Sequence, residues 1–432
     1  MTSYVSTRRR GHPGRWLAIA MTAALMATAC GTDDTPADGP VTVNVLIPDS
    51  SSNIVDPAYK VLNPEFTKRT GTSVTFVKSG GDYGAVEERI LAARIAGNLP
   101  DAAIISSASI RTYVDAKLAQ PFDSLMKADT SYDPTTAEPS LLKFGARDGK
   151  TYALPLTASW VVMYYNTEIF KKAGLNPDDP PETLTELGAA ARKIVDSGAA
   201  KHGLAFRLSD DPNMWRLQNV VASGGGSLMN DDESEPTFDD PALLGLVRFL
   251  ADLAKDGVIA HYDAESMSEA YYRGDVGIVY DASSGARTHA KSANFDYRIA
   301  PYPIPDGGRR ILSAGGASIV MFTDDPVRQQ AVWEAVRELV GPAGGAAYLE
   351  EQGGGVLVLD AAANKSKAKE HAELALKPED VADFAPMVQF PGRSAQEIWT
   401  ILGEQILAVL QSGKDPATAL ADAEAAAKPL LP

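Results

Sequence analysis

The sequence has one cysteine, Cys30, among its 432 residues, and only five histidines. A single cysteine excludes a disulfide framework and leaves no thiol nucleophile in the rest of the chain. Four histidines lie beyond residue 30: His202, His261, His289 and His371. They are widely scattered and match no HExxH motif, and the chain has no G-x-S-x-G nucleophile elbow. The glycine-rich stretch 224–227 lacks the Lys-Ser/Thr pair of a phosphate loop. We therefore expect no catalytic residue, no metal and no cofactor.

Positive charge is also scarce. The chain has 40 Lys and Arg against 56 Asp and Glu, a formal net charge of −16. This balance argues against nucleic acid and against an anionic membrane surface as the main partner. The acidic clusters at 178–179, 231–233 and 239–240 lie beside prolines or in turns, where helix caps and solvated loops explain them. Their spacing does not fit a calcium loop.

The first apolar run, residues 16–27, is too short for a comfortable membrane span. It follows four arginines and leads into Ala-Thr-Ala-Cys30-Gly, which resembles a bacterial lipobox with alanine where leucine is commoner. We predict a lipoprotein signal peptide over residues 1–30, lipidation of Cys30, and a disordered tether over 31–40. Removal of the four arginines with the leader changes the formal net charge from −16 to −20.

The length exceeds that of a typical domain and favours two lobes. From residue 41, predicted strands at 41–47, 73–77 and 102–105 alternate with helices at 57–69 and 83–96, which indicates a parallel sheet with crossover helices. Ligands bind at the carboxyl ends of such strands. The loops 49–52, 80–83 and 106–109 should therefore lie at the functional edge. Later helices are expected over 182–197, 212–222, 241–256, 326–340, 394–410 and 416–428.

The stretch 154–175, LPLTASWVVMYYNTEIFKKAGL, predicts a polar loop, a buried strand and a short helix capped at Asn166. It resembles the extracellular solute-binding proteins of ABC importers, in their carbohydrate and glycerol-phosphate branch. Similar stretches of the same family are found, in the expected order, at 97–101, 282–285, 311–319 and 412–420. No single stretch is diagnostic, but their order and spacing together support the family.

The resemblance implies an α/β, two-lobed periplasmic-binding-protein type II fold. Each lobe is expected to be a mainly parallel sheet flanked by helices, with the ligand cleft between the lobes. The N-terminal lobe would comprise 41–153 plus 311–345, and the C-terminal lobe 154–310 plus 346–432, with a first crossing at 150–155. The implied partners are a small solute and the transmembrane permease of an importer. The chain would be a monomer that contacts the membrane only through its lipid.

A sugar is held by aromatic rings on its apolar faces and by polar groups on its rim. Trp160 and Trp215 are the aromatic candidates, whereas core packing is the alternative for each and the expected place of Trp333 and Trp399. The strand-end loops contribute Asp49, Ser51 and Asp82. Residues carried over from the glycerol-3-phosphate and glycerophosphodiester binders of the family are Tyr83, Ser159 or Ala158, Ser283 or Ser284, and Gly315 or Gly316.

Three positions depart from those phosphate binders. Ser107 stands in place of their acidic residue, Gly355 in place of a tyrosine, and Gln389 in place of an arginine. Glutamine cannot donate the pair of charge-assisted hydrogen bonds that an arginine guanidinium donates to a phosphate. We therefore expect a neutral sugar, oligosaccharide or polyol. A glycerol-phosphate ligand stays open because Arg393, or Arg207 or Arg287, could replace the missing arginine.

Two other classes remain as rivals. A secreted carbohydrate-active enzyme would need paired carboxylates in a cleft, and no predicted cleft loop holds an obvious pair. The same fold could also serve as a sensor or adhesin without a transporter, which a neighbouring permease gene would argue against.

Overall fold

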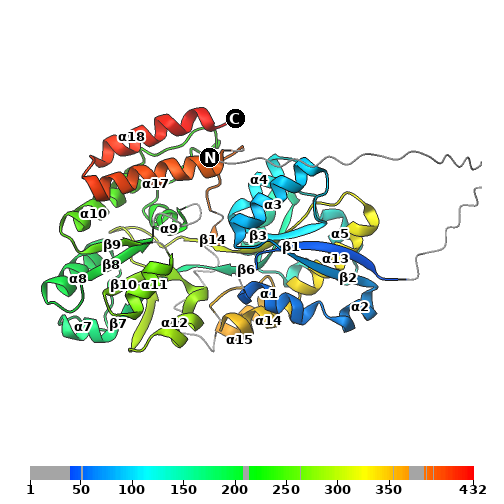
Figure 1. Cartoon of the computed structure of the whole chain (residues 1–432), viewed down its shortest axis with the longest axis horizontal. Helices are drawn as coiled ribbons and strands as arrows, with labels where there is room; N and C mark the ends of the chain where they lie inside the picture. Colours follow the sequence, from blue (N-terminus) through cyan, green and yellow to red (C-terminus); the bar gives the residue numbers. More distant parts are fainter. Residues whose placement is uncertain are drawn as a thin grey trace, which may run out of the picture. The chain divides into compact units, whose positions relative to one another are not determined.

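Two five-stranded sheets form the framework of the protein (Figure 1). The computed structural model describes residues 39–49, 52–207, 214–262, 264–353, 355–368, 384–385, 387–392 and 394–432. All that follows concerns these residues.

The first sheet has the strand order β2-β1-β3-β13-β6. Its strands are β1 (Val41–Ile47), β2 (Thr72–Lys78), β3 (Ala102–Ser106), β6 (Ala153–Ser159) and β13 (Gly315–Met321). β1 pairs parallel with β2 and β3, whereas β13 lies antiparallel to both β3 and β6. Four strands therefore run in one direction, and β13 alone runs against them. This sheet and the helices packed on it are called the first lobe.

The second sheet has the order β11-β7-β10-β8-β9. Its strands are β7 (Val161–Asn166), β8 (His202–Arg207), β9 (Ile259–Tyr262), β10 (Val276–Ala282) and β11 (Tyr297–Pro301). β8 pairs parallel with β9 and β10, and β7 is antiparallel to β10 and β11. Here β7 is the only reversed strand. This sheet and its helices are called the second lobe, and the mostly parallel α/β architecture predicted from the sequence is confirmed.

Both faces of the first sheet are buried, because alternate residues of each strand point to opposite sides. Val43, Val45 and Ile104 join the core cluster that also contains Trp333 of α13. Leu46, Ala103 and Ile105 join a second cluster with Val86 and Ile90 of α3. A strand that is apolar on both faces reads as a continuous hydrophobic run, which is what β3 and the second half of β1 (45–47) show.

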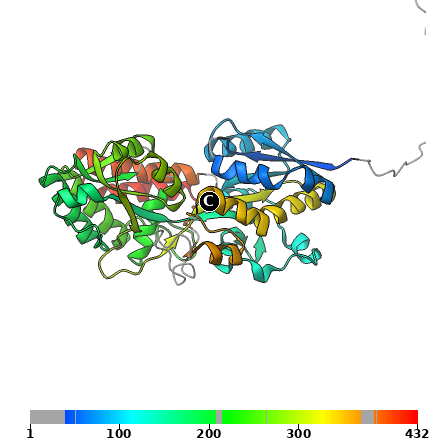
Figure 2. The same ribbon diagram turned by 90° about the horizontal axis from the view of Figure 1, so that it is seen from below.

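The first lobe carries nine described helices: α1 (Ser52–Val61), α2 (Pro64–Thr70), α3 (Tyr83–Ala96), α4 (Ile110–Asp115), α5 (Asp123–Ala128), α6 (Pro139–Leu142), α13 (Pro326–Val340), α14 (Pro342–Gln352) and α15 (Ala361–Ala368). In Figures 1 and 2, α14 lies beside α1, with which it packs. The sequence predicted one helix over 57–69. Two form instead, because Asn63 caps the N-terminus of α2 and Pro64 occupies its first turn.

The second lobe carries α7 (Thr167–Lys172), α8 (Leu184–Asp196), α9 (Trp215–Ser223), α10 (Pro241–Lys255), α11 (Ala264–Tyr272), α12 (Ala286–Ser292), α17 (Ala395–Ser412) and α18 (Pro416–Ala427). Thr183 and Glu186 form a capping box at the start of α8. α17 and α18 pack on each other and on α10 (Figure 1). Short 3-10 turns are Ser107–Ser109, Pro134–Thr136, Lys143–Gly145, Ser283–Gly285 and Lys428–Leu430.

The first passage between the lobes lies at a different place from that expected, whereas the return passage lies within 311–319, where the N-terminal lobe was expected to resume. Ala153–Ser159 is strand β6 of the first sheet, so the first crossing occurs at Trp160 rather than at 150–155. The second crossing runs through β12 (Leu312–Ser313) into β13, and β12 pairs with β14 (Phe384–Ala385). The helices α14 and α15 pack in the first lobe, although 346–368 was expected in the second. A small two-stranded sheet of β4 (Ala146–Arg147) and β5 (Lys150–Thr151) precedes β6.

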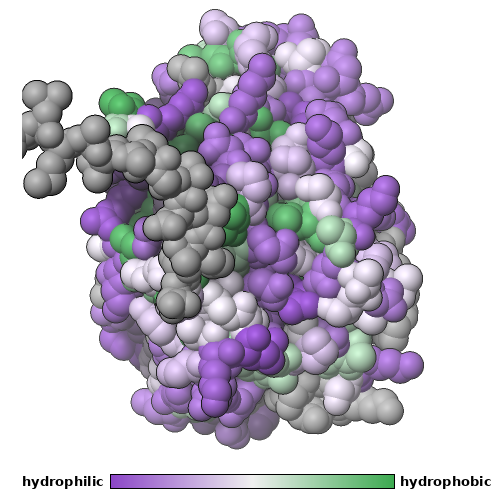
Figure 3. Space-filling view, turned by 90° about the vertical axis from the view of Figure 1, so that its right-hand side faces the viewer, coloured by the Kyte–Doolittle hydropathy of each residue, from purple (hydrophilic) through white to green (hydrophobic). Residues whose placement is uncertain are grey.

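Figure 3 shows that the surface on one side of the first lobe is mainly hydrophilic, with apolar residues in small separate groups. Across the described ranges, no helix has the length and apolar character needed to cross a membrane.

Candidate ligand-binding cleft

A cavity of about 320 Å³ lies where strand ends of the two sheets meet. β3 ends there at Ser106 and β6 at Ser159, from the first lobe. β8 ends there at Arg207, from the second lobe, and β10 brings its last residue, Ala282. The reversed strand β13 begins there at Gly315. These are the carboxyl ends of the strands that run in the common direction, where a sheet of this kind holds its ligands.

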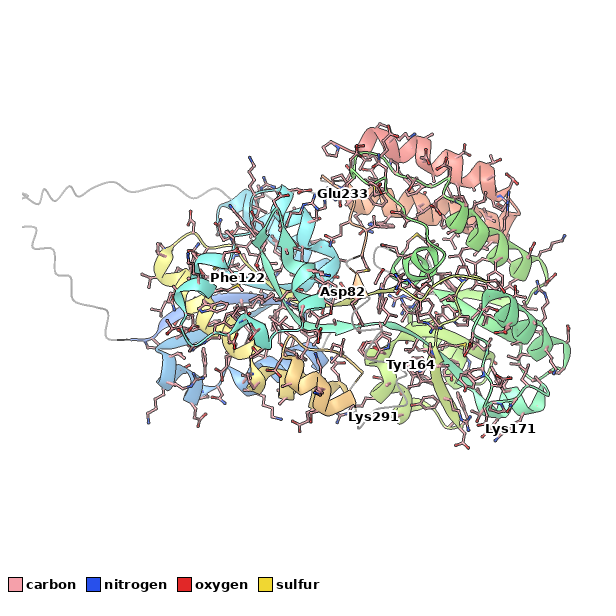
Figure 4. All side chains as sticks on the ribbon, turned by 180° about the vertical axis from the view of Figure 1, so that it is seen from behind. Asp82, Phe122, Tyr164, Lys171, Glu233 and Lys291 are labelled. Atoms are coloured by element: carbon pink, nitrogen blue, oxygen red, sulfur yellow. The ribbon has the colours of Figure 1, made fainter. Side chains whose placement is uncertain are left out.

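The first-lobe wall contains Asp82 and Tyr83 at the start of α3. The Asp82 carboxylate caps the helix by accepting a hydrogen bond of 2.9 Å from the Gly84 amide, and its side chain stays exposed. Figure 4 shows Asp82 on the side of the first lobe that faces the second. Burial raises the pKa of the Tyr83 phenol, so it keeps its proton and both donates and accepts hydrogen bonds.

Trp215 begins α9 on the second-lobe wall and is 8% exposed. Its indole N–H donates to the carbonyl of Ser313, which fixes the ring. A Cβ added at Gly315 would lie 3.1 Å from the indole, so glycine makes room for the ring there. At Gly316, φ is +137° and a Cβ would lie 2.0 Å from the Thr157 carbonyl oxygen. Only glycine permits this approach of β13 to β6.

Arg216, Asp281 and His289 form a buried polar group beside Trp215. The Arg216 guanidinium, 2% exposed, donates to Asp281 at 2.6 Å and to the Tyr280 carbonyl at 3.0 Å. Asp281 also accepts the Ala282 amide at 2.8 Å and lies 3.3 Å from Nε2 of His289. Burial alone would raise the pKa of Asp281, but the His289 hydrogen bond and the Arg216 charge lower it below the usual aspartate value. The carboxylate is therefore ionised, and Arg216 and Asp281 both line the cleft.

Sequence reasoning nominated seven residues that the structure places in the cleft lining: Asp82, Tyr83, Ser159, Trp215, Ser284, Gly315 and Gly316. Arg207, weighed as a substitute cation, also lines it. Arg216, Asp281 and Gln352 were not nominated. One sequence feature could have identified Asp281: it is a charged residue directly after the apolar run 276–280.

Trp160 does not line the cleft. It is 3% exposed and packs edge to face on Phe384, as the core-packing alternative describes. Its amide donates to the hydroxyl of Ser283 at 3.1 Å, and that hydroxyl donates to the Gly355 carbonyl at 2.6 Å. Ser283 is fully buried. Trp160, Ser283 and Gly355 therefore tie together three chain segments at the crossing between the lobes.

Three other nominated residues lie elsewhere. The Ser107 hydroxyl is buried against that of Ser318, at 2.7 Å. Asp49 is exposed and its carboxylate accepts from Ser79. Gln389 lines a separate cavity of about 390 Å³, where its side-chain oxygen accepts the Arg111 amide at 2.8 Å.

Arg287, the other substitute cation, donates to the carbonyls of Glu350 and Glu351. Ser51, Arg393 and Cys30 lie outside the described residues. Within the described part of the chain, no three His, Cys, Asp or Glu side chains gather in a way that could hold a metal ion.

Comparison with known proteins defines the class. The sequence model of the bacterial extracellular solute-binding protein family matches residues 64–385. The chain therefore belongs to the bacterial extracellular solute-binding protein family, which confirms the resemblance drawn from the sequence. It is an extracytoplasmic solute-binding protein of an ABC transporter, in a family that binds small solutes and catalyses no reaction.

Two of the relatives that are similar in sequence illustrate the match. A binding protein of Brucella abortus is 27% identical over 352 residues, covering 78% of this chain and 80% of that protein. The sn-glycerol-3-phosphate-binding periplasmic protein of Yersinia enterocolitica is 27% identical over 290 residues, covering 62% of this chain and 65% of that protein.

Two of the solved structures that are similar in fold illustrate the architecture. The cyclic alpha-maltosyl-1,6-maltose binding protein of Arthrobacter globiformis has a TM-score of 0.76 and 22% identity, and the match covers 91% of this chain and 99% of that one. The UgpB protein of Mycobacterium tuberculosis, in complex with glycerophosphocholine, has a TM-score of 0.75 and 18% identity, with 90% and 98% covered. Both confirm the periplasmic-binding fold.

Proposed function

We propose that this protein captures a neutral carbohydrate, a sugar, oligosaccharide or polyol, and delivers it to the permease of its importer. The proposal rests on one observation: the formal charges of the described residues that line the cleft cancel. Its charged lining residues among those described are two cations, Arg207 and Arg216, and two anions, Asp82 and Asp281. Their formal charges cancel, so the cleft lining has no net charge to favour an anionic solute.

Neutral polar groups and an aromatic ring complete the fit. Side chains that can exchange hydrogen bonds with hydroxyls line both walls: Tyr83, Ser106, Thr157, Ser159, Ser284 and Gln352. Trp215 adds the flat apolar surface that the C–H face of a sugar ring prefers. A ring-shaped polyol held between these walls would contact both lobes.

Contact with both lobes supports hinge closure as the mechanism. A solute that touches Asp82 and Tyr83 on one wall and Trp215 on the other stabilises the closed arrangement over an open one. The permease then recognises the closed form. The crossings at Trp160 and at Leu312–Gly315 are the segments where the backbone would absorb the rotation.

Lipidation of Cys30 belongs to the same proposal and rests on the lipobox-like sequence alone. The lipid would hold the protein at the outer face of the cytoplasmic membrane, within reach of its permease. Labelling with a radioactive fatty acid tests this directly: the wild-type chain should be labelled, and the variant Cys30→Ser should be unlabelled and released.

A glycerol-3-phosphate or glycerophosphodiester ligand is the second candidate. The relative from Yersinia enterocolitica carries that specificity in its name, and Arg207 lines the cleft. A glycerophosphodiester with a cationic head group has no net charge and would place its phosphate near Arg207 and its cation near Asp82.

Thermal-shift screening of residues 31–432 separates the two candidates. The panel contains maltose, ribitol, tagatose, glycerol-3-phosphate and glycerophosphocholine. A solute at one hundred times its dissociation constant stabilises the fold by about 2.7 kcal/mol. A shift with a neutral sugar or polyol supports the proposal, and a shift with the phosphate compounds alone favours the second candidate. No shift with any sugar, polyol or glycerol phosphate would favour a transporter-free sensor.

A further inference from the structure

The Asp281 carboxylate is held by donors from three different segments. Arg216 of α9 donates to Oδ1 at 2.6 Å, and the Ala282 amide donates to the same oxygen at 2.8 Å. Nε2 of His289, on α12, lies 3.3 Å from Oδ2. An ionised carboxylate accepts about four hydrogen bonds. Three are made by described groups, and the side chain is still 21% exposed at the cleft wall. One acceptor direction is left for a solute.

His289 is itself fixed by a shell of tyrosines. Its side chain is 3% exposed and stacks on Tyr164, with ring centroids 3.9 Å apart. Its Nδ1 lies 3.2 Å from the Tyr272 hydroxyl. Tyr271 and Tyr297 pack against the remaining sides of the imidazole. Figure 4 shows Tyr164 on the side of the second lobe nearer the first.

Both ring nitrogens of His289 thus have a partner, and neither partner is a solvent group. If Tyr272 donates to Nδ1, the neutral imidazole carries its proton on Nε2 and donates it to Asp281. A chain of hydrogen bonds then runs from Tyr272 through His289 to the cleft carboxylate. Removal of Tyr272 or His289 would leave the next buried polar group without its hydrogen-bond partner. The two residues therefore fix the orientation of the Asp281 carboxylate.

We propose that His289 and Tyr272 are positioning residues that hold Asp281 as an obligate hydrogen-bond acceptor of the cleft. The inference rests on the proposed function and deepens it. An acceptor-only group binds a solute hydroxyl, which can donate, and repels a solute oxyanion, which cannot. Asp281 therefore selects hydroxyl-bearing neutral solutes at this point of the wall, and the buried histidine sets the direction in which it accepts.

The experiment compares four variants of residues 31–432, titrated with maltose, ribitol and glycerol-3-phosphate by calorimetry. Asp281→Asn should weaken the binding of the neutral probe at least about tenfold, because a hydrogen bond to a charged group is lost. The same variant should strengthen the binding of glycerol-3-phosphate, because a like charge is removed. A purely structural role would weaken both.

The histidine variants test positioning. His289→Leu should weaken the neutral probe about fivefold or more, whereas His289→Gln, which retains a donor, should stay within about threefold of the wild type. Lys291→Gln is the matched control, because Lys291 is exposed on the same helix (Figure 4) and should change nothing. Melting curves establish that each variant folds. Wild-type affinity in His289→Leu overturns the proposal.

A measurement without ligand keeps this proposal separate from the proposed function. Long-range 1H–15N spectra of the imidazole should show the Nε2–H tautomer of His289 in the wild type and its loss in Asp281→Asn. The Nδ1–H tautomer in the wild type would overturn the positioning role. If no probe binds the wild type, the proposed function falls and the recognition role of Asp281 falls with it, whatever the tautomer.

Discussion

Arg111 of the first lobe and Glu233 of the second form an ion pair of 2.7 Å. Arg147, also on the first lobe, reaches the same carboxylate at 2.9 Å. Figure 4 shows Glu233 at the edge where the two lobes approach each other. Burial would raise the pKa of Glu233, but the hydrogen bond from Arg147 and the charge of Arg111 lower it. Glu233 also has a positive φ of 57°, an uncommon conformation for a residue other than glycine. This contact links the lobes beside the cleft.

Removal of this contact should favour an open arrangement of the lobes. Glu233→Gln is expected to weaken the apparent affinity for a bound neutral solute at least about twofold, because the buried Arg111 and the half-buried Arg147 lose the carboxylate with which they pair. The loss should be largest at low salt and smaller at about 0.5 M NaCl, where the partly exposed Glu233 carboxylate is partly screened. Glu235→Gln is the control, since Glu235 faces Lys428 within the second lobe. Equal salt dependence in both variants would contradict a link between the lobes.

Gly316 should be the most sensitive glycine of the cleft. Gly316→Ala places a methyl group against the Thr157 carbonyl oxygen at a backbone angle that alanine avoids. We expect a loss of about 2–4 kcal/mol in the free energy of unfolding, measured by denaturant titration. Gly245→Ala, in α10 with open space around the added carbon, should instead stabilise the fold by about 0.5–1 kcal/mol. A neutral effect of Gly316→Ala would mean that β13 can shift away from β6.

The two tryptophans nominated from the sequence should behave differently. Trp215→Ala is expected to weaken the binding of a neutral sugar at least about tenfold, because the stacking surface at the cleft is lost. Trp160→Phe should lower the melting temperature while the dissociation constant stays within about twofold, because Trp160 packs on Phe384 outside the cleft. Calorimetric titration of both variants decides. A large loss of affinity in Trp160→Phe would return Trp160 to the ligand site.

Acid should destabilise the first lobe partly through Asp129. Burial would raise the pKa of this carboxyl, but hydrogen bonds from Ser131 and Trp333 and the charge of Arg337 lower it. A folded-state pKa below the unfolded value gives stability that is present above about pH 4 and is lost as the pH falls further. Asp129→Asn should therefore flatten the acid side of a plot of unfolding free energy against pH. Asp56→Asn, at an exposed site on α1, is the control. An unchanged acid limb would contradict this role.

Local signals in the sequence predicted individual elements well. The helix over 83–96 lies between the cap Asp82 and the left-handed Gly97, and the helix over 326–340 follows the cap Asp325 and begins with Pro326. Both were predicted with their observed ends, because capping depends on residues adjacent in the chain. Tyr83 was expected at the cleft because of the resemblance to the phosphate binders of the family, and it ends the predicted loop 80–83, which follows a strand at the carboxyl edge of the sheet.

The cluster of three polar side chains at the cleft wall could not be predicted from local sequence signals. Arg216, Asp281 and His289 come from α9, β10 and α12, and only the folded sheet brings them together. Trp160 illustrates the opposite error. Its place in a polar loop suggested a ligand-facing ring, but the short crossing between β6 and β7 turns it onto Phe384. In both cases, contacts between segments that are distant in the sequence determine where the side chains lie.

The position of β13 between β3 and β6 has a consequence for synthesis on the ribosome. β6 pairs with no other strand of its sheet than β13, yet β13 begins at Gly315, long after β6 ends at Ser159. The edges of β3 and β6 in the nascent first sheet must therefore stay unpaired while all five strands of the second sheet are made. Contacts so distant in sequence form slowly and leave apolar strands exposed in the interval. In this topology the second sheet has all its strands before the first sheet can be completed, so the last step in forming the first sheet is the insertion of β13 between β3 and β6.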